Sequence, residues 1–113
     1  MTDIYTELLN RLREGETLAV ATIVRTRGST PREVGAKMLI DGHGKAVGTI
    51  GGGCGEADVW VEAQEVLETG KPSLIQVDLL SDADAQGGRA CGGIMYVHIE
   101  RVSGRQEVKG NGG

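Results

Sequence analysis

The sequence predicts a single small domain of the α/β class, α+β-like in organisation, in which a small mixed β-sheet packs against two main helices. Three observations support this prediction. The chain has 113 residues, which is the size of one compact domain. Apolar residues make up 39% of it, as in a globular chain, and the core must be aliphatic because aromatic residues amount to only 3%. Segments with helical periodicity also alternate with short runs of strand-forming residues.

The first half of the chain contains one predicted helix and three predicted strands. Residues 17–26 are rich in β-branched side chains and short enough for a buried strand. Residues 36–40 and 46–50 form the next two strands, joined as a hairpin by a turn that Asp41-Gly42 signals. Residues 3–14 form a packing helix whose apolar face consists of Ile4, Leu8, Leu9 and Leu12.

The second half contains the other helix and two more strands. Residues 73–80 resemble a strand with partial alternation, and residues 94–102 alternate cleanly, which is typical of a half-buried strand. Residues 1–103 are therefore expected to form the domain, and residues 104–113 a disordered tail. The helix is predicted over residues 56–69, with an apolar stripe of Val59, Trp60, Ala63, Val66 and Leu67.

Charge and composition exclude several kinds of partner. The net charge of −4 argues against non-specific binding to nucleic acid or to an anionic membrane surface. No apolar run in the sequence approaches the roughly 20 residues that a membrane span requires. The first residues show no basic region followed by an apolar one, so we expect a cytoplasmic protein whose two cysteines are reduced thiols.

Three loops carry residue types from which a functional site could be built. The triple-glycine turn spans residues 51–55, and a cysteine–glycine loop spans residues 91–93. The arginine–proline loop spans residues 25–35 and offers guanidinium groups from Arg25, Arg27 or Arg32. If the loops converge, they bring together two thiols, exposed backbone amides and positive charge. Such a site suits an anionic ligand, and it also suits sulfur or metal chemistry.

The triple-glycine turn combines an exposed backbone with a thiol at a helix start. Gly51, Gly52 and Gly53 lack side chains, so a ligand or another strand can approach the peptide groups closely. Cys54 follows where the second helix begins, and the partial positive charge of a helix start favours the thiolate. Neither a dinucleotide fingerprint nor a phosphate P-loop is predicted, because the glycine and lysine spacings do not match.

Each of these elements also has a structural interpretation. The glycines can serve only tight strand–helix packing, and Cys54 and Cys91 can be small core residues. Glu56 is favourable in the first turn of a helix without any role in binding. A zinc site is not predicted, because the two cysteines, His43 and His98 show no short ligand spacing.

The three loops together resemble the XdhC/CoxI family, the accessory proteins of xanthine dehydrogenase and carbon monoxide dehydrogenase. The matching motifs are GSTPR at residues 28–32, GAKM at 35–38, GTIGGGCGE at 48–56 and CGG at 91–93. Their order and spacing make the resemblance more specific than any one motif, and it covers most of residues 5–102. One departure is Gly55, where the family commonly has a larger residue, so we expect a loosened helix start.

The resemblance implies a chaperone, more so than an enzyme, for the molybdenum cofactor. Family members bind molybdopterin as a transient ligand while its sulfido ligand is installed, and deliver it to a molybdenum hydroxylase apoenzyme. It also implies a cysteine desulfurase as a partner, and a Rossmann-type partner domain, which family members usually carry after this one. The residues expected to bind the cofactor are Arg25, Ser29, Arg32, Gly51, Gly52, Gly53, Cys54, Glu56, Cys91 and Gly92.

Two other hypotheses fit the same residues. In the first, Cys54 or Cys91 is a catalytic nucleophile that carries persulfide sulfur in a transfer reaction. In the second, the glycines and cysteines are structural, and the domain docks onto a separate Rossmann-type partner or the apoenzyme. A homodimer is also expected, because pairing covers a sheet edge and two-fold dimers are the commonest oligomers.

Overall fold

The computed structural model describes residues 3–50, 55–79 and 92–104. Gly51, Gly52, Gly53, Cys54 and Cys91 therefore lie outside the described residues, as does nearly all of the predicted tail. The described elements are α1 (Ile4–Arg13), β1 (Thr17–Arg27), β2 (Lys37–Asp41), β3 (Ala46–Gly48), α2 (Glu56–Thr69), β4 (Ser73–Asp78) and β5 (Ile94–Ser103).

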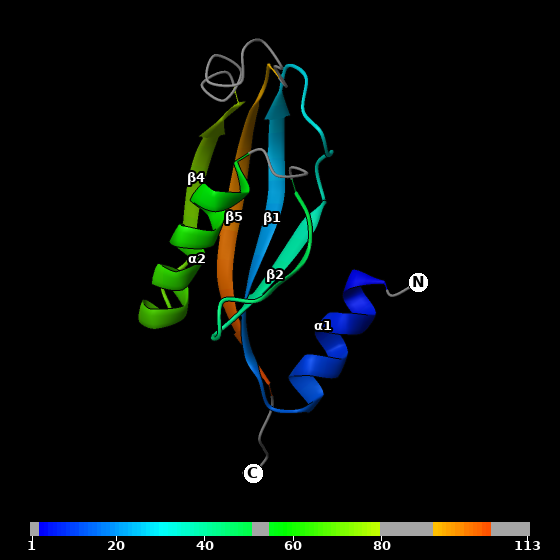
Figure 1. Ribbon diagram of the computed structural model, residues 1–113, viewed down its shortest axis with the longest axis vertical. Coiled ribbons are helices and arrows are strands. Elements are labelled where there is room, and N and C mark those ends of the chain that lie inside the picture. The colour runs from blue at the N-terminus through cyan, green and yellow to red at the C-terminus, as the bar shows by residue number, and fades with distance from the viewer. Residues whose placement is uncertain (1–2, 51–54, 80–91, 105–113) are drawn as a thin grey trace.

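The five strands form one sheet in the order β3-β2-β1-β5-β4, which confirms the predicted class with two helices (Figure 1). All described pairings are antiparallel, whereas the sequence suggested a mixed sheet. The reason lies in the crossover through α2. It joins β3 to β4, which run in the same direction, but these two strands occupy opposite edges and never pair.

Side chains of β1 alternate between two apolar clusters on opposite faces of the sheet. Ala19, Ala21 and Ile23 point toward α2 and belong to the larger cluster, which fills the space between sheet and helix. Leu18 and Val20 point the other way and form a smaller cluster near α1. The chain therefore has three layers, with α2 covering β1, β5 and β4, and α1 resting chiefly on β2.

The helix α1 is anchored by few residues. Ile4 and Leu8 pack against the smaller cluster, whereas Leu9 is 53% exposed although the periodicity places it on the apolar face. That expectation is wrong because α1 lies over a narrow patch beside β2, too small to cover the whole stripe. Asp3 stands at the N-cap without a side-chain capping bond.

The helix α2 buries Val59, Ala63 and Val66 against the sheet. Trp60 was expected in the same stripe, but it is 39% exposed and its indole Nε1 donates a hydrogen bond to the carbonyl of Gly44 at 2.8 Å. Its ring thus covers the tip of the β2–β3 hairpin instead of entering the core, because its N–H finds a partner there. Neither helix in the described residues is long and apolar enough to cross a membrane.

A bulge interrupts the pairing of β1 with β5 between Ile23 and Arg25. Ile23 lies opposite Val97 on the α2 side, and Arg25 lies opposite Tyr96, which is on the other face. Without the extra residue Val24, strict alternation would turn Arg25 toward the core. The bulge therefore keeps the guanidinium on the face that α2 does not cover.

The last described residues lie beside the C-terminal end of α1, at the opposite end of the sheet from the bulge. Thr17 pairs with Ser103, and the N–H of Gly104 donates to the carbonyl of Glu16 at 2.8 Å. Near them, Asp41 accepts hydrogen bonds from the N–H groups of His43 and Lys45, both at 2.9 Å. These bonds stabilise the β2–β3 turn, so the Asp41 carboxylate at this end of the molecule has a structural role.

Candidate functional site

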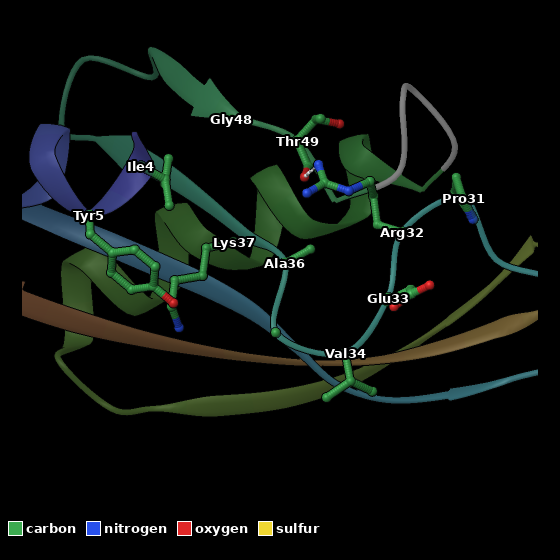
Figure 2. A pocket seen from close by; sticks show the side chains of 11 residues that line it. Ile4, Tyr5, Pro31, Arg32, Glu33, Val34, Ala36, Lys37, Gly48 and Thr49 are labelled. Atoms are coloured by element: carbon green, nitrogen blue, oxygen red, sulfur yellow. Dashed lines mark hydrogen bonds between the residues drawn. The ribbon is translucent and has the colours of Figure 1, made fainter. Parts of the chain in front are cut away.

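The arginine–proline loop is tied to the end of β3 by a single side chain. The Nη1 group of Arg32 donates a hydrogen bond to the carbonyl oxygen of Thr49 at 2.8 Å. Arg32 is itself placed by Thr30, whose hydroxyl donates to the Arg32 carbonyl at 2.9 Å in a local turn. The loop therefore faces the strand end that leads into the triple-glycine turn (Figure 2).

Thr49 continues the connection to α2. Its hydroxyl donates to the carboxylate Oε2 of Glu56, and the same oxygen accepts the backbone N–H of Ile50 at 3.2 Å. Glu56 is the first residue of α2, where a negative charge is favourable. Arg32, Thr49 and Glu56 thus form one chain of contacts, which we call the Arg32–Glu56 relay. It ties together the two described flanks of the triple-glycine turn.

Gly55 begins α2 in a way that only glycine allows easily. Its φ is +74°, and a Cβ built there would overlap Cγ1 of Val77 on β4. The helix start therefore lies directly against the sheet. Gly55 has the role of a close packing contact, which differs from the loosened helix start predicted from sequence.

The cysteine–glycine loop approaches the arginine–proline loop from the other side. A Cβ on Gly93 would overlap the carbonyl of Ser29 and lie 2.7 Å from that of Arg27. A Cβ on Gly28 would lie 3.0 Å from the carbonyl of Gly92. The two backbones are therefore in contact, and the glycines make this contact sterically feasible.

A hydrogen bond closes the base of the segment between β4 and β5. The N–H of Leu79 donates to the carbonyl of Gly93 at 2.9 Å. The described residues on either side of Cys91 and of Cys54 thus reach the same end of the sheet, and the arginine–proline loop contacts both sets. The described flanks of the other two loops thus both contact the arginine–proline loop, and the convergence of the loops themselves stays a prediction.

The predicted site residues fall into three groups. Arg32 and Glu56 are joined by the Arg32–Glu56 relay, and Gly92 lies with Ser29 in the contact between the two loops. Arg25 lies apart from both groups, because the bulge puts it over the ring of Tyr96, 5.4 Å from the ring centroid. The third group lies outside the described residues and consists of Gly51, Gly52, Gly53, Cys54 and Cys91.

A pocket of about 630 Å³ opens beside the relay, between α1 and the arginine–proline loop (Figure 2). Residues 31–37 form one wall, and the end of β3 at Gly48 and Thr49 forms another. The first turn of α1 closes it with Ile4 and Tyr5. The pocket lies at the edge of the sheet formed by β2 and β3.

Sequence reasoning missed three residues that line this pocket. Lys37 was expected inside the strand at 36–40, Tyr5 in an amphipathic helix, and Thr49 in a returning strand. Each comes from a different element and acquires its place in the pocket only through tertiary contact. The available hints were the GAKM motif, which contains Lys37, and the GTIGGGCGE motif, which contains Thr49.

The electrostatic features at the other end of the sheet belong to the fold. Burial raises the pKa of Asp41, but hydrogen bonds from the N–H groups of Lys45 and His43, with the charges of His43 and Arg11, hold it below its ordinary value. Arg11 has a raised pKa, chiefly because its guanidinium is hydrogen-bonded to Glu7. Among the described residues, no three histidine, cysteine, aspartate or glutamate side chains gather as a metal site would require.

Comparisons with known proteins agree with this geometry. A Bacillus subtilis protein named as a probable xanthine dehydrogenase subunit is 35% identical over 105 residues, which are 91% of this chain and 32% of that protein. The molybdenum cofactor insertion chaperone PaoD of Escherichia coli is 35% identical over 65 residues, which are 58% of this chain and 20% of that protein. The chain thus spans about a third or less of the length of these relatives.

The fold has a similar solved structure. A crystal structure described as a xanthine dehydrogenase from Bacillus halodurans matches with a TM-score of 0.72 and 36% identity, covering 85% of this chain and 30% of that one. The family model of the XdhC and CoxI family matches residues 11–78, which include β1, the arginine–proline loop and all of α2. On this match, the chain belongs to the XdhC and CoxI family.

Proposed function

We propose that this chain binds the molybdenum cofactor as a transient cargo and helps to insert it into a molybdenum hydroxylase of the xanthine dehydrogenase or carbon monoxide dehydrogenase type. The observation that carries the proposal is the meeting of the arginine–proline loop with the flanks of both cysteine-containing segments. A guanidinium group thereby lies beside Thr49, which precedes the triple-glycine turn, and the same loop contacts Gly92 and Gly93.

The residues suit the chemistry of this cargo. Molybdopterin carries a phosphate, and a dithiolene holds the metal. Arg32 presents a planar guanidinium that uses one N–H on Thr49, and arginine is well suited to bidentate binding of phosphate. We assign the cysteines to the metal or sulfur end of the cargo, as candidates that face it or carry its sulfur.

The relatives support the same role. PaoD is named as a molybdenum cofactor insertion chaperone, and the Bacillus subtilis protein is named for xanthine dehydrogenase. Both are much longer than this chain, so the proposal covers only what one domain contributes. We propose that a Rossmann-type domain, on the same or another chain, and a cysteine desulfurase complete the process.

The test is to purify the chain from cells that make molybdopterin and measure pterin retained, by the fluorescence of its oxidised form. We expect stoichiometric or near-stoichiometric retention that falls when Cys54 is replaced by serine, and unchanged retention for a surface control such as Lys45→Gln. Absence of pterin from the intact protein, with and without the client apoenzyme, would refute the proposal.

Exposed apolar side chains favour docking as a second function. Leu74 on the edge strand β4 is 63% exposed, and Val24 at the bulge is 47% exposed. Leu74 lies opposite His98, on the face of the sheet that α2 does not cover. Edge strands with exposed apolar residues are sites of pairing with another chain.

The docking proposal is tested separately. Leu74→Glu should abolish association with the client or with a second copy while leaving pterin retention intact. The predicted homodimer is checked in the same experiment by light scattering at micromolar concentration. A complex that survives Leu74→Glu would place the interface elsewhere.

A further inference from the structure

We propose that the pocket between α1 and the arginine–proline loop holds a phosphorylated heterocycle, with Tyr5 against the ring, Lys37 beside that ring and Arg32 at the phosphate. For this family of ligands the relevant molecule is the pterin phosphate portion of the cofactor, so the inference rests on the proposed function. It adds a recognition site in which Tyr5 of α1 joins residues of the sequence motifs that suggested that function.

The pocket has the size and the walls of a small-molecule site. Its volume of about 630 Å³ lies within the ~300–1,000 Å³ typical of ligand pockets. Three separate elements line it: the first turn of α1, the arginine–proline loop running into β2, and the end of β3. Figure 2 shows Tyr5 and Lys37 at one end of the pocket and Arg32 with Thr49 at the other.

The charged side chains that line the pocket favour an anionic ligand. The lining carries two basic side chains, Arg32 and Lys37, against one carboxylate, Glu33, so it is locally positive. The chain as a whole has a net charge of −4, so the charge of this pocket is opposite in sign to that of the chain. The planar guanidinium of Arg32 suits a phosphate at one end of the pocket, and the ammonium of Lys37 adds positive charge at the other.

Lys37 is held in place before any ligand arrives. Its Nζ donates a hydrogen bond to the hydroxyl of Thr22 at 2.9 Å and lies 5.9 Å from the centroid of the Tyr5 ring. The side chain is half-buried, so its position costs little further ordering on binding. An ammonium fixed beside an aromatic ring places positive charge next to a stacking surface.

Tyr5 supplies that stacking surface. It is 53% exposed, which leaves much of an aromatic side chain in water at the mouth of a pocket. Aromatic rings gain from offset stacking on other planar groups. An inorganic anion would use the positive charge of the pocket but would leave the Tyr5 ring without a stacking partner. An uncharged heterocycle would stack on the ring but would leave the positive charge without an anion. A phosphorylated heterocycle uses all three side chains.

Gly48 shows that the pocket wall is built closely. Its φ is +84°, and a Cβ there would lie 2.8 Å from both the Cδ1 of Ile4 and the carbonyl of Lys37. The strand end, the helix and β2 therefore meet at one glycine. With the bond from Arg32 to Thr49, this contact fixes the distance between the two ends of the pocket.

The experiment measures binding of neopterin monophosphate to the full chain by fluorescence anisotropy, with neopterin as a second fluorescent probe and inorganic phosphate as a competitor. We expect neopterin monophosphate to bind at least about tenfold more tightly than neopterin or phosphate, because it engages both the ring and the cations. Lys37→Gln and Tyr5→Leu should each weaken binding by about tenfold or more. Lys37→Arg and Tyr5→Phe should retain most of it, and the matched control Lys45→Gln all of it.

Each outcome decides the inference. Equal binding by wild type, Lys37→Gln and Tyr5→Leu, with urea midpoints showing all three folded, would overturn it, as would no binding by wild type at millimolar probe. If wild type and both variants retain molybdopterin from cells equally, the proposed function stands and this site falls. If wild type retains no molybdopterin but binds the probe through Lys37, the proposed function falls and the pocket stands as a pterin phosphate site.

Discussion

Replacing Gly93 by alanine tests how closely the cysteine–glycine loop and the arginine–proline loop approach each other. The new Cβ would overlap the carbonyl of Ser29 and lie 2.7 Å from that of Arg27. Both partners are backbone atoms, so no side chain can rotate away to make room. Overpacking of this kind costs about 1–3 kcal/mol, and we expect the upper end, ~3 kcal/mol, because the strands behind the carbonyls are paired.

Two other glycines serve as matched controls. Gly92 has a φ of +77° and no atom of the described residues within 4 Å of its Cβ position, so Gly92→Ala should cost only the left-handed conformation, about 1 kcal/mol. Gly42 has no positive φ and no close neighbour among the described residues, so Gly42→Ala should be neutral or stabilising by about 0.4–1 kcal/mol. The series thus separates steric overlap from backbone conformation.

Urea unfolding, followed by the fluorescence of the single tryptophan, measures the effect. With slopes of about 1–3 kcal/mol/M for small proteins, a loss of ~3 kcal/mol lowers the midpoint by at least about 1 M. The expected order of midpoints is Gly42→Ala highest, then Gly92→Ala, then Gly93→Ala. Equal midpoints for Gly93→Ala and Gly42→Ala would refute the close approach of the two loops.

Three further predictions concern other parts of the structure. Glu56→Gln should lower the free energy of unfolding by ~1.5–3 kcal/mol, because the Glu56 carboxylate accepts hydrogen bonds from Thr49 and Ile50 at the helix start. Asp58→Asn in the same turn is the control and should lower it much less, as measured by thermal melts. Because the pKa of Asp41 is held below 3.8, its carboxylate stabilises the fold above that pH, and this stabilisation is lost as the pH falls through the pKa of the folded state. The difference in free energy of unfolding between wild type and Asp41→Asn should therefore narrow from about pH 6 to about pH 3 in urea titrations. A difference that stays constant over this range would contradict the lowered pKa. Trp60→Phe removes the bond to the Gly44 carbonyl and should cost ~1 kcal/mol, with faster amide exchange at the hairpin tip.

The sequence predicted the elements of the fold closely, because local patterns determine them. The alternation of Met95, Val97 and Ile99 gave β5, and the Asp41-Gly42 turn gave the hairpin. The direction of the strands could not be predicted, because it depends on which edges the α2 crossover joins. No periodicity within a helix or a strand encodes that connection.

The candidate site was predictable only in part. Arg32, Thr49 and Glu56 all stand in motifs, but the sequence does not show that Thr49 connects the other two through its carbonyl and hydroxyl groups. Arg25 has the right residue type, yet one extra residue in the strand redirects it to another face. Contacts made by carbonyl groups and strand bulges are properties of the backbone, so side-chain identity does not reveal them.

The pairing of Thr17 with Ser103 has a consequence for how a longer protein would be assembled. Any segment joined after Gly104 starts beside the end of α1, at the end of the sheet opposite the candidate site. The 11 residues of β1 separate the two ends by about 35 Å at ~3.3 Å per residue. A neighbouring domain tethered there can swing without crowding the mouth of the site, and it must cross the length of the sheet to deliver or receive a ligand.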